Sequence, residues 1–537
     1  MQRKPFRPGT ALESGTEYYA TSKTYHIHLS DCREVVGHGY VHIDRPLATA
    51  FYLADLENVT VDLGGARLVF HGRIAPFIVS GCRNVTLRNF TVAYDRPFYT
   101  QADIVGRDER GITVRVCDGF PYRVDDGVFV AVSDTWEQPL SGDHCIVQPF
   151  DRTTMAPAFG AGCILAAFGH CDSVNPPLPV AILKAVDCGG RTVRFEGEFP
   201  PGWQPGLTIA VTHEVRDKNG ILAERSSDIT VERVRLEHCA AMGFVGMFCH
   251  NITLRRFDMY VDGDGLVTAN ADGVHCLHCT GRIDISDCVF ENMLDDAVNI
   301  HGNYTVVTAA AGPQVTLEAR TAAVEAIEWY RPGDVLTVYR GRTLEEQGAF
   351  TVRSVRYDGY TIHVTADRPV TAAPGDTVEN AAAPDIFIRR CLSGRNRGRG
   401  FLLSGSGKTV AEDCYFRSCD CAVHFTGDTS YWYESGPVRD VTVRGCFFDD
   451  CGYCGQPYAI IAAPDFVPTD KAPFYHTNVR IEGNVFRTFT GGLLQARYTD
   501  GIVFRDNRVI RSQAYPGGDI PAVSLSDCGA ADTDTGA

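Results

Sequence analysis

Short segments in which β-branched residues alternate with polar ones recur along the chain. Each is followed by a small or amide residue and then by a further apolar pair. Alternation with period two is typical of β-strands with one buried face, and helix-period patterning is scarce. The clearest segments read ENVTVDL, RNVTLRNFTV, SDITVERVRL, HNITLRRFDM, GRIDISDCVF, PDIFIRRCLS, RDVTVRGCFF and NVRIEGNVF. The pattern predicts an all-β protein.

These segments repeat with a period close to 23 residues. Three intervals have this length: Ile229 to Ile252, Cys391 to Cys414 and Asn484 to Asn507. It fits one coil of a parallel β-helix, whose rungs stack roughly 4.8 Å apart. Equivalent residues should then form an internal ladder at one turn, filled by small apolar thiols and by asparagines that bond to neighbouring rungs. The predicted ladder consists of Cys288, Cys391, Cys414, Cys446, Asn484 and Asn507.

Two stretches interrupt the period and contain hairpin-like strands with Gly- and Pro-rich turns, as in small β-barrels. The first spans residues 98–215 and the second residues 304–380. We therefore predict a parallel β-helix with two inserted small β-barrel-like modules. The remaining parts of the domain organisation are a discontinuous β-helix of residues 1–97, 216–303 and 381–530 and a flexible tail of residues 531–537.

Composition limits the partners. A net charge of -16 argues against nucleic acid and against an anionic membrane, but does not affect a neutral sugar. No apolar run has membrane-spanning length, and MQRKPFRPGT lacks the apolar core of a signal peptide. We expect a cytoplasmic protein, or a secreted or periplasmic one if a leader has been removed. The 20 cysteines occur mostly singly, which favours reduced, buried thiols. The oligomeric state stays open, a homodimer included.

The candidate chemistry lies in ENMLDDAVNIHG, where Asp295 and Asp296 interrupt an apolar run. Asp272 precedes Asp295 by 23 residues, so one rung should bring the three carboxylates side by side. Mutual repulsion should raise the pKa of at least one of them. One protonated and one ionised carboxyl are what glycosidic cleavage by paired acids requires.

Taken singly, each aspartate also fits a structural role as a turn cap. The one-rung spacing, together with the neighbouring Asn270, His275, Asn299 and His301, favours an active site with these four as substrate-binding residues. Each histidine individually also fits a structural role.

Two further segments are candidates for substrate binding. SGRNRGRGF supplies Arg397 and Arg399, which fit either a solvated turn or contacts to sugar hydroxyls. GDTSYWYESGP, residues 427–437, supplies Trp432 as a stacking platform and Glu434 as a hydroxyl acceptor, or else packs over the β-helix edge.

The motifs for cofactors are incomplete. GSGKT lacks the first glycine of a phosphate loop, and a strand follows it. VDGDGLVTANADG has Leu266 where the third ligand of a calcium loop should be, and no closing glutamate. Cys276 and Cys279 in HCLHC have no second pair at zinc-finger spacing. We expect neither a metal nor an organic cofactor.

TANADGVHCLHCTGRIDISDCVFENMLDDAVNIHG, followed by Asn303 and Tyr304, resembles the core of glycoside hydrolase family 110, the α-1,3-galactosidases. RNRGRGFLLSGSGK and YWYESGPVRDVTVRGCFF are similar to further family stretches, so the resemblance covers nearly the whole chain. It implies a right-handed parallel β-helix with two inserted barrels. It also implies exo-acting removal of terminal α-1,3-linked galactose with inversion, from oligosaccharides or glycans such as blood group B or linear Galα1-3Gal ends.

The resemblance places the catalytic residues on Asp272, Asp295 and Asp296. By analogy with polygalacturonase β-helix enzymes, Asp295 would be the general acid, and Asp272 and Asp296 would share the attacking water. Because inversion requires carboxyls roughly 6.5–9.5 Å apart, the side chains would have to splay. The alternatives are a polygalacturonase-like hydrolase of another α-glycoside, which Arg397 and Arg399 would favour, and a non-catalytic carbohydrate-binding β-helix.

Overall fold

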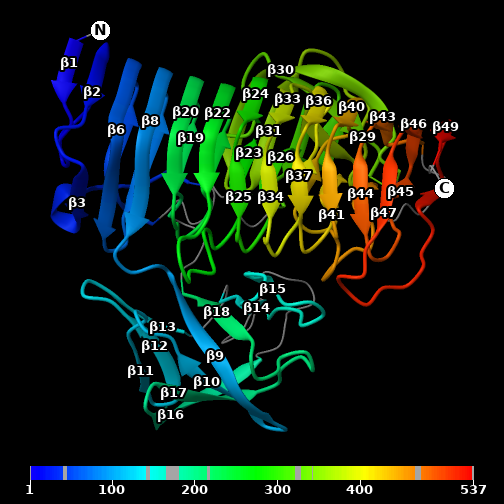
Figure 1. The fold of residues 1–537 in the computed structure, drawn as a ribbon. Helices are drawn as coiled ribbons and strands as arrows, with labels where there is room; N and C mark the ends of the chain where they lie inside the picture. The colour runs from blue at the N-terminus through cyan, green and yellow to red at the C-terminus, as the bar shows by residue number, and fades with distance from the viewer. Residues whose placement is uncertain are drawn as a thin grey trace.

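The computed structural model describes residues 2–39, 45–140, 145–164, 181–213, 218–320, 328–341, 343–465 and 473–534. Most of these residues form parallel strands that are stacked in rungs. The stack extends from the N-terminus at one end of the molecule to the C-terminus at the other (Figure 1). The only helical element described is the 3-10 turn η1 (Leu29–Asp31). None of the described helices is long and apolar enough to cross a membrane. The predicted all-β parallel β-helix is confirmed.

The larger sheet bends around the coil and contains 20 strands. They are β1 (Gln2–Pro5), β2 (Thr16–Tyr19), β3 (Thr24–His28), β6 (Glu57–His71), β8 (Arg83–Tyr94), β20 (Ser227–Leu236), β22 (His250–Met259), β24 (Thr280–Ser286), β25 (Val289–Glu291), β33 (Asp385–Arg389), β34 (Leu392–Gly394), β36 (Lys408–Glu412), β37 (Tyr415–Arg417), β40 (Asp440–Arg444), β41 (Phe447–Asp449), β43 (His476–Glu482), β44 (Val485–Thr488), β46 (Thr499–Arg505), β47 (Arg508–Arg511) and β49 (Ala531–Thr533).

A second sheet closes each coil. Its strands are β4 (Arg33–Val35), β5 (Leu47–Ala54), β7 (Ala75–Ser80), β19 (Ile221–Glu224), β21 (Phe244–Met247), β23 (Val274–Leu277), β26 (Val298–Asn303), β35 (Phe401–Leu403), β38 (Val423–Phe425), β42 (Ile460–Ala462), β45 (Leu494–Arg497) and β48 (Val523–Ser526), with β39 (Glu434–Ser435) antiparallel to β26. Between the two sheets, apolar side chains stack rung on rung. Phe416, Phe448 and Phe486, for example, stack with ring centroids 5.1 and 4.5 Å apart.

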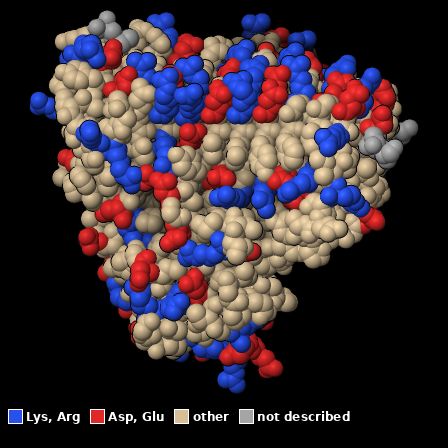
Figure 2. Space-filling model, in the orientation of Figure 1, with Lys and Arg blue, Asp and Glu red and all other residues tan. Residues whose placement is uncertain are grey.

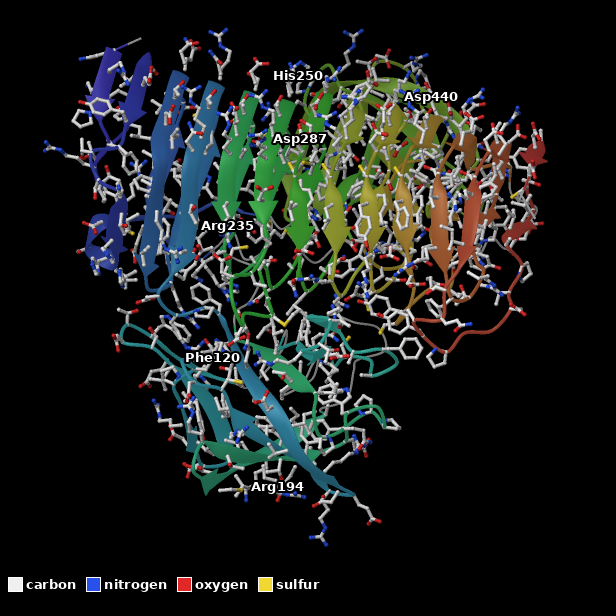
Figure 3. The ribbon with its side chains drawn as sticks, viewed as in Figure 1. Phe120, Arg194, Arg235, His250, Asp287 and Asp440 are labelled. Carbon is white, nitrogen blue, oxygen red and sulfur yellow. The ribbon has the colours of Figure 1, made fainter. Side chains whose placement is uncertain are left out.

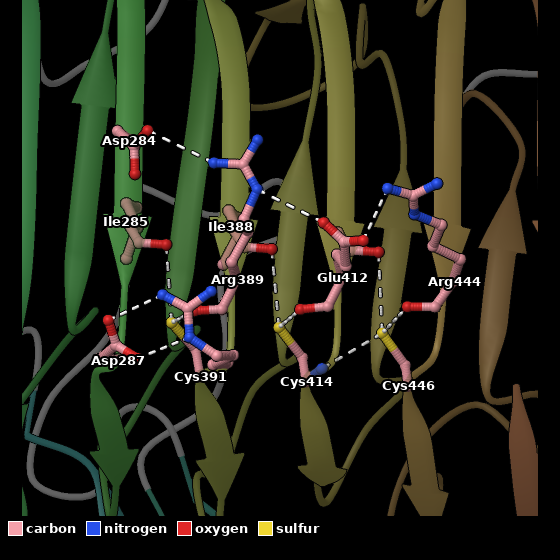
Figure 4. A network of polar contacts seen from close by, with 12 residues as sticks. Asp284, Ile285, Asp287, Ile388, Arg389, Cys391, Glu412, Cys414, Arg444 and Cys446 are labelled. Atoms are coloured by element: carbon pink, nitrogen blue, oxygen red, sulfur yellow. Dashed lines mark hydrogen bonds and ion pairs between the residues drawn. The ribbon is translucent and has the colours of Figure 1, made fainter.

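The predicted ladder is present at the bend of the larger sheet (Figure 4). The thiols of Cys391, Cys414 and Cys446 each lie 3.7 Å from a backbone carbonyl of the preceding rung. Asn484 and Asn507 continue the column. Their side-chain amides donate hydrogen bonds of 3.0 and 2.9 Å to such carbonyls. The described cysteines are free thiols.

Charged side chains line one edge of the outer face of the larger sheet, where Figure 2 shows alternating blue and red rows. Arg389 lies 3.5 Å from both Asp284 and Glu412, and Arg444 lies 2.6 Å from Glu412 (Figure 4). Opposite charges on neighbouring rungs thus alternate along the stack. Because exposed pairs contribute little each, about 0–1 kcal/mol, their main effect is to keep this face soluble and in register.

The two insertions differ in form. The first contributes a seven-stranded antiparallel sheet and a three-stranded sheet beneath the β-helix (Figure 1). Its strands are β9 (Tyr99–Asp108), β10 (Gly111–Val116), β11 (Tyr122–Asp125), β12 (Val128–Val132), β13 (Glu137–Pro139), β14 (Val147–Asp151), β15 (Ala156–Pro157), β16 (Ile182–Gly189), β17 (Thr192–Gly197) and β18 (Thr208–Thr212). The second closes into a barrel of β27 (Thr305–Ala311), β28 (Gln314–Glu318), β29 (Val335–Tyr339), β30 (Glu346–Asp358), β31 (Thr361–Ala366) and β32 (Thr377–Asn380).

The expectation of a flexible tail at 531–537 was wrong for its first residues. Ala531–Thr533 form β49, which pairs in parallel with β46. The last complete rung leaves unpaired backbone groups at its edge, and an additional short strand satisfies them. Residues 535–537 lie outside the described part.

Candidate active site

The three aspartates lie in two stacked turns that lead into the second sheet. Val274 pairs with Val298, and Val298 pairs with Phe401 on the next rung. This register aligns Asp272 with Asp296, and Asp296 with Arg399. Two carboxylates on adjacent rungs are therefore followed by a guanidinium on the third.

The predicted partner of Asp272 in the neighbouring rung was Asp295, and the register corrects this to Asp296. The bridge between Ala269 and Met293 shows that this rung contains one residue more than the usual 23. The backbone N–H of Asp296 donates to Asp272 Oδ1 at 3.2 Å. Asp295 precedes β26 in the same turn, where the chain bends, so the adjacent aspartates need not point to opposite faces as they would in a strand.

The structure nevertheless brings all three carboxylates together. One oxygen from each lies within 4.8 Å of the others, close enough for a cation to bridge them. Asp272 and Asp296 are buried, whereas the side chain of Asp295 keeps 17% of its surface exposed. Asp295 is thus the member of the trio that is most open to a ligand.

Two arginines from the turn before β35 bind the trio. The backbone N–H, Nε and Nη2 of Arg399 donate to Asp296 at 2.8–2.9 Å. Arg397 Nη2 lies 3.1 Å from Asp295 Oδ1, and its Nε donates to the Leu294 carbonyl. These arginines were predicted to contact either solvent or sugar, and their main partners are the aspartates.

Gly398, between the arginines, is required for this packing. A Cβ at this position would lie 2.7 Å from the carbonyl carbon of Asp295 and 2.7 Å from Asp296 Oδ1. Because real Cβ atoms do not approach so closely, a larger residue would push the arginine turn away from the aspartates.

The surroundings of Asp296 bring the pKa of its carboxyl close to neutral pH. Burial raises the pKa of Asp296 to about 7, with added repulsion from Asp295 and Asp272, against the lowering effect of the Arg399 guanidinium. The carboxyl can therefore gain or lose a proton near neutral pH, as an acid–base group must.

The predicted polar neighbours lie beside the trio and are mostly buried. His275 Nδ1 lies 2.6 Å from Asp272 Oδ2, and His301 Nε2 lies 3.1 Å from His275 Nε2. Asn299 Nδ2 donates to Glu434 Oε1 at 3.3 Å. His301 Nε2 also lies 3.6 Å from Glu434 Oε1, so the histidines connect Asp272 to the segment that carries Trp432.

Asn270, predicted to bind substrate, contacts the start of the first insertion. Its Nδ2 donates to the carbonyl of Phe98 at 3.0 Å. Apolar contacts extend the same junction, where Tyr99 and Phe150 of the insertion pack with Leu266 and with Leu294, the neighbour of Asp295. In Figure 3, Phe120 faces the β-helix and Arg194 lies at the far end of the insertion.

The barrel covers the other flank. Its apolar residues, including Trp329 and Tyr330, form one cluster with Ala271 and Leu277, which flank Asp272 and His275 in sequence. The site therefore lies where both insertions pack against the β-helix.

The segment 427–437 presents an exposed aromatic ring near this junction. Trp432 is 43% exposed. The buried carboxylate of Asp428 accepts hydrogen bonds from the backbone N–H groups of Ser430, Tyr431, Trp432 and Tyr433. The ring is thus available for stacking, and its loop is rigidly held.

Sequence reasoning missed His424, Gly398 and Asp428. His424 on β38 belongs to the column formed by His275, Asn299 and Leu402, so counting rungs would have revealed it. Burial, and then the charge of Arg399, lower the pKa of His424 to about 4. No spacing signal pointed to Gly398 or Asp428, since their roles depend on backbone contacts.

The fold and this cluster define a two-insertion parallel β-helix protein with an arginine-compensated carboxylate site. Residues 100–209 match a family model described as "GLAA-B beta-barrel domain I". An α-1,3-galactosidase A of Shewanella woodyi is 29% identical over 483 residues, which cover 87% of this chain and 76% of that protein. An α-1,3-galactosidase B of Bacteroides thetaiotaomicron is 27% identical over 486 residues, which cover 88% of this chain and 76% of that protein.

The chain is thus related over most of its length to the α-1,3-galactosidases of glycoside hydrolase family 110, and the resemblance seen in the sequence is confirmed. Among solved structures, a family 28 exopolygalacturonase of Yersinia enterocolitica aligns with 98% of this chain and 72% of its own. Its TM-score is 0.38 and its identity 9%, too low to bear on substrate or mechanism.

Proposed function

We propose that this protein is an exo-acting glycoside hydrolase that removes terminal α-1,3-linked galactose, with blood group B or linear Galα1-3Gal ends as substrates. The observation that carries the proposal is the gathering of Asp272, Asp295 and Asp296 with one near-neutral pKa among them. The names of the relatives supply the substrate class.

In the proposed mechanism, Asp295 is the general acid: it is the carboxyl of the trio most open to a ligand, so in its protonated form it can reach the glycosidic oxygen and transfer its proton to the leaving group. Asp272 and Asp296 share the water that attacks the anomeric carbon, which inverts its configuration. The expected splaying of the side chains is not seen, since the nearest oxygens lie within 4.8 Å. This separation is shorter than the roughly 6.5–9.5 Å usual for inversion and nearer the roughly 5–5.5 Å of retention. Inversion therefore requires a water held at the rim of the trio rather than between two distant carboxyls.

The arginine contacts favour a neutral galactoside over a uronide. A uronic carboxylate needs a cationic partner, and Arg397 and Arg399 already bind Asp295 and Asp296. The same contacts favour catalysis over simple binding, because a binding site gains nothing from three crowded carboxylates.

A proton NMR time course with Galα1-3Gal tests the proposal. Initial β-galactose that later mutarotates to the α form would support both the linkage and inversion. Initial α-galactose would support the assignment as a hydrolase but would overturn the one-step inverting mechanism. No galactose, with wild-type protein at high concentration, would overturn the substrate assignment.

A further inference from the structure

Two buried histidines form a hydrogen-bonded chain behind the trio. His275 lies on β23 and His301 on β26, the next rung. Asp272 Oδ2, the two imidazoles and the Gly302 carbonyl are joined by separations of 2.6, 3.1 and 2.6 Å. The side chain of His301 has no exposed surface, and that of His275 has 3%. His301 is thus inaccessible to a sugar, although both histidines were expected to bind one.

The geometry determines where the protons of this chain lie. A carbonyl only accepts, so His301 Nδ1 must carry the hydrogen that it shares with Gly302 O. Burial lowers the pKa of His301 by more than the Glu434 carboxylate, whose Oε1 lies 3.6 Å from Nε2, raises it, which favours the neutral ring with a bare Nε2. The bare nitrogen accepts from His275, so His275 Nε2 carries a hydrogen. His275 Nδ1 then faces Asp272 with one proton between the two atoms.

We infer that His275 and His301 are positioning residues: His301 fixes the tautomer of His275, and His275 shares one proton with Asp272. Whether the shared proton resides on nitrogen or oxygen, the Asp272–His275 pair has no net charge. Each aspartate of the trio then has its own partner, with Arg397 for Asp295 and Arg399 for Asp296. The inference rests on the proposed function, because it assigns these histidines to the same catalytic site.

Because the Asp272–His275 pair has no net charge, the three carboxyl groups can lie close together. Without the acceptor on His301, His275 could turn its only hydrogen toward Asp272 as a neutral imidazole and leave a full negative charge on the pair. That charge would repel Asp295 and Asp296 and disturb their protonation. The histidines thereby affect turnover without touching the substrate.

Two substitutions at one position separate this role from a merely structural one. His301→Asn keeps a donor near the Nδ1 position for Gly302 and removes the Nε2 acceptor. His301→Gln places an acceptor near the Nε2 position. We expect His301→Asn to lower kcat by roughly 10- to 100-fold with KM changed less than about 3-fold, and His301→Gln to recover most of kcat.

The matched control is His213→Asn in the first insertion. His213 is also buried, and its Nε2 lies 2.9 Å from the hydroxyl of Thr100. We expect this change to leave kcat unchanged at a temperature at which all the variants are folded by circular dichroism. Equal kcat in His301→Asn and His301→Gln, or a loss confined to KM, would overturn the inference.

Long-range 1H–15N NMR of histidine-labelled wild-type protein gives a readout that does not depend on activity. We expect His301 as the neutral Nδ1–H tautomer and a hydrogen on His275 Nε2. An Nε2–H tautomer of His301 would overturn the inference even in an active enzyme. A wild-type protein that releases no galactose yet shows these tautomers would overturn the proposed function and leave the proton chain intact.

Discussion

At the scale of single residues, the candidate site depends on how like charges are kept together. Asp272, Asp295 and Asp296 would repel one another in isolation, and the arginines on the following rung offset that repulsion. Burial also moves the pKa of Asp296 into the neutral range. The site therefore combines crowding, burial and fixed counter-charges, each of which shifts proton affinity.

Asp272→Asn, Asp295→Asn and Asp296→Asn should each fold and lose activity by about 10²- to 10⁴-fold, because amides cannot exchange the proton that acid–base catalysis needs. Release of galactose from Galα1-3Gal measures the effect. Asp385→Asn serves as the control, because Asp385 is an exposed aspartate that accepts a hydrogen bond from the backbone N–H of Lys408. Wild-type rates in all three site variants would refute the assignment.

Arg399→Gln should move the acidic limb of the activity profile to higher pH. Arg399 lowers the pKa of Asp296 against the raising effect of burial, so its removal leaves the pKa above about 7. A carboxylate that must be ionised to bind the attacking water then becomes available only at higher pH. The pH dependence of kcat/KM checks this, with Arg399→Lys expected to restore part of the shift. An unchanged limb would show that Asp296 does not control the rate.

At the scale of elements, turns rather than strands carry the candidate site. The strands repeat with few variations, whereas the turns before β23, β26 and β35 hold the aspartates and arginines. The segment 427–437 depends on a buried carboxylate that binds four successive backbone N–H groups. Such a cluster of donors around one anion gives a loop a single conformation.

Asp428→Asn should raise KM by about 10-fold or more with kcat nearly unchanged, because a lost bond to a charged group costs about 1.5–3 kcal/mol and frees the Trp432 loop. Trp432→Ala should shift KM in the same direction. Steady-state kinetics with Galα1-3Gal measure both variants, and Asp385→Asn again is the control. An unchanged KM in both variants would remove Trp432 from the substrate site.

Asn484→Ala should lower the free energy of unfolding by about 2–4 kcal/mol, since it leaves a buried N–H of Cys446 and a buried carbonyl of Val443 without partners. In the wild-type protein, the Asn484 side chain forms hydrogen bonds with these groups at 2.9 and 3.0 Å. Urea unfolding compares Asn484→Ala with Thr365→Ala, a partly exposed residue of the barrel whose hydroxyl bonds to Gln314. Equal effects from the two changes would contradict a stabilising role for the ladder.

At the scale of the whole molecule, two insertions far apart in sequence complete one site. The first packs against Leu266 and Leu294, and the barrel packs against Ala271 and Leu277. The β-helix provides a rigid stack of turns, and the insertions bury the flanks of the acidic trio. Burial at this junction is what raises the pKa of Asp296.

Stability should therefore depend on pH in a defined direction. Between about pH 4 and pH 7, Asp296 keeps its proton in the folded protein, while the unfolded carboxyl, with its ordinary pKa of 3.8, has lost it. The folded state binds more protons in this window, so this group's contribution to stability falls as pH rises through it. Asp296→Asn should flatten that part of the profile, and Asp385→Asn should not. Urea unfolding at several pH values between 4 and 7 measures the difference, and identical profiles would contradict a buried, near-neutral Asp296.

The repeating pattern of the sequence is enough to predict the β-helix, the two insertions, the cysteine–asparagine ladder and the three aspartates, because a stacked coil repeats its hydrophobic pattern once per rung. Which residues share a rung at the site depends on the folded structure, because one additional residue there aligns Asp272 with Asp296 instead of Asp295. The folded structure is also needed to find the partners of Arg397 and Arg399, the hydrogen-bonded chain through His275 and His301, and the contacts of Asp428. The arginines lie 102 and 103 residues beyond their aspartates and His301 lies 26 residues beyond His275, so these contacts depend on how the turns stack, which no local pattern records.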